Sequence, residues 1–343
     1  MSAGDAFTPG LELNRGFFLE VVAPIVAPWP HAAGLLGWGS DVLGFDTARS
    51  TDHGWGPRLQ VFVAEADVAA ARAAVDAGLP ERYRGWPVRY GWDAVPVGHH
   101  VDVVSLGVWL RGQLGRDPRL GMDITDWLAI PQQSLLGVVR GAVYADPDGE
   151  LGRVREQLGW YPRDVWLWML ACQWRRIAQE EAFVGRTAEV GDELGSRVIA
   201  ARLVRDLMRL CLLLARRHQP YAKWLGREYS ALDDPDGLGP ALLEALAAGE
   251  GPARQAALAG CCERVAVRHN RLGITEAVDP TPRPFHGRPF PVLMADRFVD
   301  ACLREVRDAR LTALPLAGSV DQLADTTDVL SDPARARRLM ALY

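Results

Sequence analysis

Hydrophobic positions follow short and changing periods in the chain up to residue 146. In residues 58–63 apolar side chains recur at every second position, which predicts a strand. Residues 65–77 are rich in alanine and stop before Gly78 and Pro80, which predicts a helix. The same reasoning predicts further strands at residues 32–38, 86–90 and 99–104, and helices at residues 14–26 and 105–114.

The pattern changes after Pro162, where apolar residues recur at helical spacing. The longest of these segments, residues 192–217, places most of its leucines on one side of a predicted helix. Glycine and proline in the turn at residues 146–149 mark the predicted boundary between the two halves. We therefore expect an α+β protein, with a mixed sheet and helices in residues 1–146 and a helical bundle in residues 147–343. Further helices are predicted at residues 220–224, 238–248, 252–270 and 292–308.

Composition narrows the class of protein. The 343 residues are 49% hydrophobic and 24% charged, with a net charge of −5, which fits a folded protein and argues against a nucleic-acid partner. The longest apolar runs, such as residues 210–215, are far shorter than the roughly 20 residues of a membrane span. The first ten residues lack the pattern of a secretion signal, so a cytoplasmic location is expected. The five cysteines form no CxxC pair, and we expect reduced, buried thiols.

Polar residues with phosphate and metal chemistry follow the predicted strands. Gly39 and Ser40 come after the apolar run at residues 32–38, where a glycine turn opening a helix can hold phosphate through backbone N–H groups. Asp52 and Asp102 each stand beside strand-like sequence, and such carboxylates can hold Mg²⁺. Each feature alone is also typical of a loop turn, a helix cap or a surface aspartate. Their order along the chain is more specific than any one of them.

This order resembles the nucleotidyltransferase superfamily with the polymerase-beta-like fold. There a Gly-Ser turn precedes a carboxylate, here 12 positions after Ser40 (52 minus 40), and another aspartate follows on a distant strand. Longer strings resemble one bacterial branch, domain of unknown function 4037, from about residue 14 to residue 300. These strings are GWGSDVLGFD, DHGWGPR, VGRTAEVGDELGS and PYAKWLG. The resemblance implies no assigned activity for the branch itself.

The resemblance implies roles for individual residues. Gly39 and Ser40 match the turn that binds the β- and γ-phosphates of a nucleotide, and Asp52 and Asp102 match the first and third metal-binding carboxylates. The superfamily pattern is Asp-x-Asp, whereas position 54 is glycine, so the second carboxylate is missing from its expected place. Asp41, Asp46 or His53 are alternatives for that ligand. Without a substitute, one metal ion or none binds.

The helical half is similar to the C-terminal bundle of small-molecule nucleotidyltransferases, where a lysine and arginines reach the triphosphate. Lys223, the only lysine of the chain, is the candidate clamp, and Arg202 and Arg205 are candidate helpers. A solvated helix face is the alternative for these three residues. Glu180 and Glu181 are candidates for a general base, with salt bridges to Arg175 or Arg176 as the alternative. The Arg264-x4-His269 spacing resembles helical ribonuclease toxins, although a helix cap is the more common role of such a histidine.

Together these patterns predict an Mg²⁺-dependent transfer of a nucleoside monophosphate from an NTP to a small hydroxyl-bearing acceptor. The net negative charge favours a small molecule over a polynucleotide as acceptor. The first alternative is a catalytically altered or inactive relative that binds a nucleotide or metabolite. The second is an antitoxin-like modifier of a protein partner. Gly54 favours the alternatives, while Gly39, Ser40 and the aspartates favour the enzyme.

Overall fold

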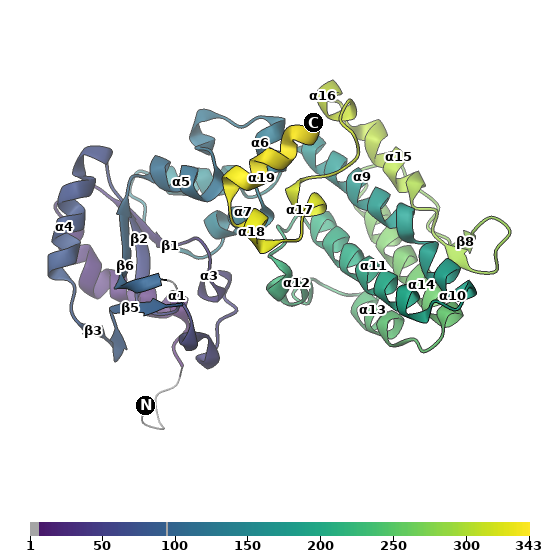
Figure 1. Cartoon of the computed structure of the whole chain (residues 1–343). Helices are drawn as coiled ribbons and strands as arrows, with labels where there is room; N and C mark the ends of the chain where they lie inside the picture. Colours follow the sequence, from purple (N-terminus) through teal and green to yellow (C-terminus); the bar gives the residue numbers. More distant parts are fainter. Residues whose placement is uncertain (1–6, 94) are drawn as a thin grey trace. The chain divides into compact units, whose positions relative to one another are not determined.

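The computed structural model describes residues 7–93 and 95–343. The chain forms two compact units, and each is described by itself. The first unit contains the residues up to 122 and residues 133–159, and the second contains residues 123–132 and 160–343. The sheet belongs to the first unit and the long helices to the second, so the α+β prediction is confirmed (Figure 1).

A five-stranded mixed sheet is the framework of the first unit, in the order β5-β6-β2-β1-β7. β2 and β6 run parallel, and the other neighbouring strands are antiparallel. Three predicted strands are confirmed as β1, β2 and β6, whereas β7 closes one edge without having been predicted. The strands are β1 (Ala32–Leu35), β2 (Arg58–Phe62), β5 (Arg89–Trp92), β6 (Val95–Val104) and β7 (Ala142–Ala145), with a separate hairpin of β3 (Arg82–Tyr83) and β4 (Trp86–Pro87).

Alternation along β2 and β6 gives the sheet two different faces. Leu59 and Val61 of β2 and Val101 and Val103 of β6 are buried in one hydrophobic core, which also includes side chains of the helices α1 and α4. Arg58 and Gln60 of β2 and Asp102 of β6 alternate with these residues and point to the opposite face. The α-helices of this unit are α1 (Gly10–Phe17), α2 (Ala23–Val26), α3 (Ser40–Leu43), α4 (Val68–Gly78), α5 (Leu106–Leu114), most of α7 (Gln132–Val139) and α8 (Glu150–Gln157).

The helix predicted at residues 14–26 differs from the observed one. It begins earlier, at Gly10, and a π-helical turn at Phe18–Val22 separates α1 from α2. Pro24 is the second residue after this turn and has no N–H to donate to the carbonyl of residue 20. The widened turn is therefore placed where the regular ladder of hydrogen bonds is interrupted.

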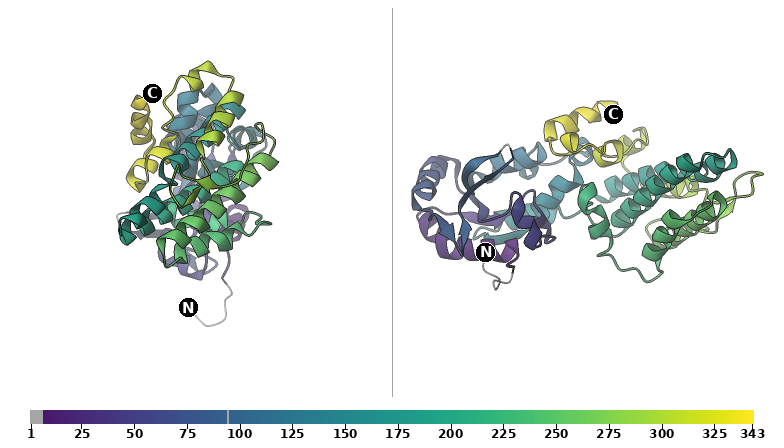
Figure 2. Two further views of the ribbon diagram at one scale, coloured as in Figure 1. Left: turned by 90° about the vertical axis from the view of Figure 1, so that its right-hand side faces the viewer. Right: turned by 60° about the horizontal axis from the view of Figure 1, so that its bottom comes forward.

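The second unit is built from helices that run side by side, drawn in teal and green in Figure 2. α9 carries three fully buried tryptophans, Trp166, Trp168 and Trp174, and it contacts α11 and α15. Among the described residues, no helix is long and apolar enough to cross a membrane. The α-helices are α6 (Ile124–Ala129), α9 (Arg163–Glu180), α10 (Phe183–Glu189), α11 (Glu193–Leu214), α12 (Ala222–Tyr229), α13 (Leu238–Ala247), α14 (Gly251–Arg271), α15 (Asp296–Glu305), α16 (Ala309–Thr312), α17 (Val320–Leu323), α18 (Thr327–Leu330) and α19 (Pro333–Leu339).

The last long helix starts later than predicted. Residues 292–308 were expected to be helical, but α15 begins at Asp296, and Pro291–Val292 (β9) pairs with Arg283–Pro284 (β8). The cause is Glu181, the residue that follows α9. Its buried carboxylate accepts hydrogen bonds from the backbone N–H groups of residues 293, 294 and 295. This binding holds the segment out of the helix, with Met294 in the left-handed region at φ 59°.

Candidate functional site

The Gly39–Ser40 turn joins the end of β1 to the short helix α3. Gly39 has φ of 150°, and a Cβ atom there would overlap the side chains of Asp41 and Arg58. Only glycine fits this position, because the backbone conformation and the space both exclude a side chain. The predicted turn therefore exists, but the space beside it is filled by the protein's own side chains.

A buried ion pair fills that space. Arg58 donates to both carboxylate oxygens of Asp41, at 3.0 Å from Nε and 2.7 Å from Nη2, and to the carbonyl of Trp38 at 2.9 Å. The side chains of Asp41 and Arg58 are only 2% and 13% exposed. Burial alone would lower the pKa of Arg58, but the charge of Asp41 holds it above its usual value. Asp41 Oδ1 also accepts from the N–H of Val42 at 3.0 Å, so a side chain of α3 itself already binds an N–H group at the start of this helix.

Asp102 lies in the middle of β6, on the face away from the main core. Its partner in the register of the parallel pair is Gln60, as His100 is the partner of Arg58. Gln60 Oε1 accepts from the N–H of Leu36 at 2.9 Å. Asp102 keeps contact with solvent, and the partial burial of its carboxylate raises its pKa, against a smaller lowering by Arg72. The two polar positions of β2 beside Asp102 thus hold a guanidinium and an amide.

Asp52 lies outside the sheet, at the end of the 3-10 helix Ala48–Asp52, and it is exposed. The next residue, His53, pairs with Asp93 at 3.3 Å on the surface. Gly54 has φ of 60°, and a Cβ there would lie 3.3 Å from the Trp92 ring. Position 54 therefore faces an aromatic ring in this structure.

The alternatives for the missing carboxylate are engaged elsewhere. Asp46 accepts from the Gly10 N–H at 2.7 Å and from Nε1 of the buried Trp55 at 2.9 Å, while Asp41 is held by Arg58. Among the residues that the structure describes, no group of three or more His, Cys, Asp or Glu side chains is placed to hold a metal ion. The pairing of Asp52 with Asp102 around Mg²⁺ stays a prediction.

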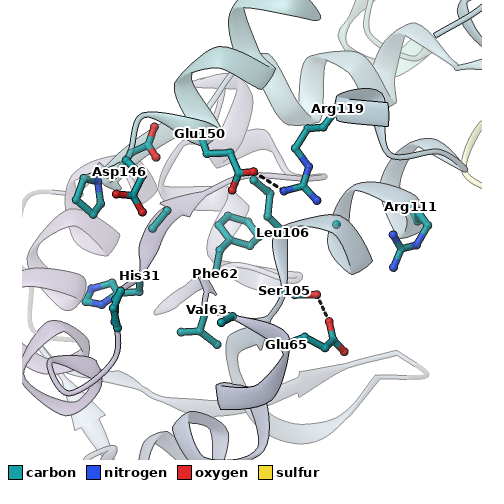
Figure 3. Close-up of a pocket in the computed structure, with 16 residues that line it drawn as sticks. His31, Phe62, Val63, Glu65, Ser105, Leu106, Arg111, Arg119, Asp146 and Glu150 are labelled. Carbon is teal, nitrogen blue, oxygen red and sulfur yellow. Dashed lines mark hydrogen bonds and ion pairs between the residues drawn. The ribbon is translucent and has the colours of Figure 1, made fainter. Parts of the chain in front are cut away.

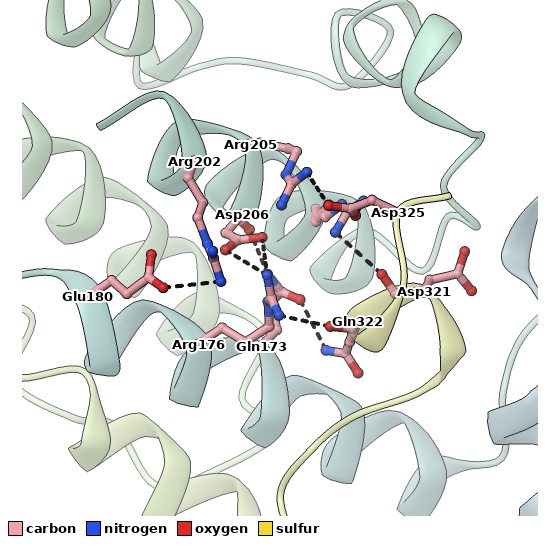
Figure 4. A network of polar contacts seen from close by, with 10 residues as sticks. Gln173, Arg176, Glu180, Arg202, Arg205, Asp206, Asp321, Gln322 and Asp325 are labelled. Atoms are coloured by element: carbon pink, nitrogen blue, oxygen red, sulfur yellow. Dashed lines mark hydrogen bonds and ion pairs between the residues drawn. The ribbon is translucent and has the colours of Figure 1, made fainter. Parts of the chain in front are cut away.

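The predicted phosphate clamp lies in the second unit, where its arginines have acidic partners (Figure 4). Arg202 pairs with Glu180 at 3.1 Å, and Arg205 pairs with Asp325 at 2.7 Å. Lys223 is exposed on α12, with Nζ 5.0 Å from the centre of the Trp224 ring. A role of these residues toward a nucleotide stays a prediction.

Two further candidates of the helical half have structural contacts. The buried carboxylate of Glu181 accepts hydrogen bonds from three backbone N–H groups, and burial raises its pKa to about 7. The expected alternative, a salt bridge to Arg175 or Arg176, is wrong, because Arg175 pairs with Asp296 and Arg176 with Asp206. A role of Glu180 or Glu181 as general base stays a prediction. His269 is fully buried and accepts from Trp174 Nε1 at 3.2 Å, which does not fit a ribonuclease role.

Sequence reasoning missed Arg58 and Gln60. A signal for them was present, because alternation in residues 58–63 places both on the face opposite Leu59 and Val61. The Arg58–Asp41 pair itself spans 17 residues across a glycine turn, and no local pattern predicts it.

Comparison with known proteins gives a family for part of the chain. Residues 127–225 match the family model described as Domain of unknown function (DUF4037). The chain is similar to that family. The resemblance to DUF4037 is thereby confirmed for a segment that begins in α6 and ends in α12, and that includes Lys223 but not the Gly39–Ser40 turn.

One solved structure is also similar, that of a nucleotidyltransferase-like protein from Exiguobacterium sibiricum 255-15. It is 13% identical, with a TM-score of 0.34, and the match covers 80% of this chain and 82% of that one. No curated protein matches the chain.

Proposed function

We propose that this protein is a catalytically altered nucleotidyltransferase-like protein, which binds a nucleotide or metabolite without Mg²⁺-dependent nucleotidyl transfer. The observation that carries the proposal is the pair of polar positions on β2. Arg58 and Gln60 share a face of the sheet with Asp102. The superfamily pattern is Asp-x-Asp, and this Arg-x-Gln pair has the same alternating spacing on a strand beside the third aspartate.

Electrostatics support a loss of metal chemistry. A guanidinium two residues from the Gln60 position repels a divalent cation, and an amide contributes one weak neutral oxygen, which here accepts from Leu36. Asp41, the nearest carboxylate to Arg58, is already neutralised. Asp102 alone offers a single carboxylate, fewer than the two that bridging metal ions need. The residues present on this face therefore do not fit an Mg²⁺ site.

Calorimetric titration with each NTP, with and without Mg²⁺, tests the proposal. We expect any NTP affinity to be the same in the presence of Mg²⁺ and of a chelator, and no change of affinity in Asp102→Asn. A heat of binding that requires Mg²⁺ and disappears in Asp102→Asn would refute it. Asp300→Asn, an exposed aspartate on α15 in the second unit, is the matched control.

Nucleotidyl transfer to a small acceptor is the second candidate. The Gly39–Ser40 turn at the start of α3 and the position of Asp102 favour it. This candidate predicts Mg²⁺-dependent NTP binding that is weakened by Asp52→Asn and by Lys223→Ala. The loss expected for Lys223→Ala is about 1.5–3 kcal/mol, the usual contribution of a hydrogen bond to a charged group.

A further inference from the structure

A cavity of about 460 Å³ opens in the first unit at the end of the sheet opposite the Gly39–Ser40 turn (Figure 3). β1 is antiparallel to β2, and Ala32 lies opposite Phe62, so the start of β1 meets the end of β2. Phe62 and Ala32 both line the cavity. Ser105, directly after the parallel strand β6, lines it too. Ligands of α/β sheets commonly bind beyond the carboxyl ends of parallel strands.

The cavity has an apolar floor and polar walls. Phe62, Val63 and Leu106 form the floor, and they are all buried. Two groups of the wall bind each other, because the Ser105 hydroxyl donates a hydrogen bond to the carboxylate of Glu65. The same wall continues into the first turn of α5. The floor suits a hydrocarbon segment, and the walls suit charged ends.

One side of the cavity carries two arginines, Arg111 and Arg119, together with the carboxylates of Glu65 and Glu150. Arg119 is fully engaged, because it binds Asp117 through two nitrogens and Glu150 at 2.7 Å. Arg111 is different: its guanidinium is 3.9 Å from Asp117, beyond hydrogen-bond distance, and 54% of its side chain is exposed. Arg111 therefore forms an ion pair with Asp117 without a hydrogen bond, and its exposed guanidinium still offers N–H donors to a ligand.

The other side of the cavity has a carboxylate and an imidazole. Figure 3 shows His31 and Asp146 together on the side away from Arg111. His31 Nδ1 donates to the carbonyl of Trp29 at 2.8 Å, so Nε2 is the ring nitrogen that remains for a ligand. The carboxylate of Asp146 accepts hydrogen bonds from the N–H of Gly152 at 2.7 Å and from the N–H of Leu151 at 3.3 Å.

We propose that this cavity binds a small zwitterion whose ammonium and carboxylate groups are separated by an apolar spacer. The carboxylate lies against Arg111, the ammonium against Asp146 and His31, and the spacer against Phe62 and Leu106. A ligand with only one charge makes only one of these two charged contacts. The proposal does not depend on the function proposed for the Gly39–Ser40 end of the sheet.

Matched probes test the charge requirement. Isothermal calorimetry and thermal unfolding of the whole chain are measured with 6-aminohexanoate, 4-aminobutanoate and dialanine, and with hexanoate and hexylamine at the same ionic strength. We expect saturable binding of at least one zwitterion. Hexanoate and hexylamine should bind at least about tenfold more weakly, because each lacks one charged contact. No saturable binding of any zwitterion, or equal binding of hexanoate or hexylamine, would overturn the proposal.

Variants then assign the two ends. Arg111→Gln and Asp146→Asn should each weaken zwitterion binding about tenfold. Both should fold, since Arg111 is half-exposed and asparagine can replace aspartate as a helix cap. Arg82→Gln, on the exposed hairpin strand β3, is the matched control and should bind as the parent does. Unchanged binding in Arg111→Gln would contradict the assignment. So would an equal loss in Arg82→Gln.

Discussion

Both ends of the central sheet have charged side chains, but the contacts of these side chains differ between the two ends. At the Gly39–Ser40 end, Asp41 and Arg58 neutralise each other, and their side chains fill the space beside the glycine. At the opposite end, a cavity of about 460 Å³ remains, and Arg111 lies 3.9 Å from the carboxylate of Asp117, an ion pair without a hydrogen bond. The difference teaches that a motif and an available site are separate properties. A sequence pattern can persist while its charges are used to stabilise the fold.

The largest expected effect comes from breaking the pair at the closed end. Arg58→Met leaves the carboxylate of Asp41 buried without a counter-charge, and we expect a loss of about 3–5 kcal/mol in the free energy of unfolding. Denaturant unfolding measures it. The double variant Arg58→Met, Asp41→Leu should recover part of the loss, because it leaves no buried charge.

The control for this prediction is an exposed pair. Arg84 pairs with Glu20 at 2.6 Å, with both side chains about half exposed. Arg84→Met should cost less than about 1 kcal/mol, as surface pairs do. Equal losses in Arg58→Met and Arg84→Met would show that the Asp41 pair is not buried as described.

A smaller effect is expected from the glycine itself. Gly39→Ala places a methyl group where Asp41 and Arg58 lie, and we expect a loss of about 1–3 kcal/mol from backbone strain and displacement. Gly44→Ala is the matched control. Gly44 has φ of 71°, and no atom of the described residues lies within 4 Å of its Cβ position, so only the conformational part, about 1 kcal/mol, should remain. If Gly39→Ala were no more costly than Gly44→Ala, the space at Gly39 would be open.

The smallest effect on stability is expected at the open end. Arg111→Gln should change the free energy of unfolding by no more than about 0.5 kcal/mol, because the side chain is half-exposed and makes one long contact. Thermal and denaturant unfolding measure this change. A loss as large as that of Arg58→Met would mean that Arg111 serves the fold, and the contrast between the two ends would disappear.

Much of the fold follows from local sequence. Alternation predicts β2, and alanine followed by Gly78 and Pro80 predicts α4 with its end at Gly78. Long-range contacts explain the failures. The start of α15 depends on Glu181, more than a hundred residues earlier, whose carboxylate binds three backbone N–H groups. No window of sequence around residue 292 contains that information.

The candidate site was less predictable than the fold. The Gly39–Ser40 turn is where the sequence places it, and Asp102 is on a strand. The distance from Ser40 predicts Asp52 as the carboxylate beside the strand, yet β2 begins six residues later, at Arg58. The partner of Arg58 is a residue of the turn, and the register of β2 with β6 decides which side chains share a face.

Direct measurement of Mn²⁺ binding tests the central claim that this sheet face has lost its metal site. Mn²⁺ is a spectroscopic substitute for Mg²⁺, and electron paramagnetic resonance reports the free ion. We predict that the protein, with or without ATP, leaves the free Mn²⁺ signal as high as buffer with the same ATP does. A stoichiometric loss of the free signal that disappears in both Asp52→Asn and Asp102→Asn would contradict the account.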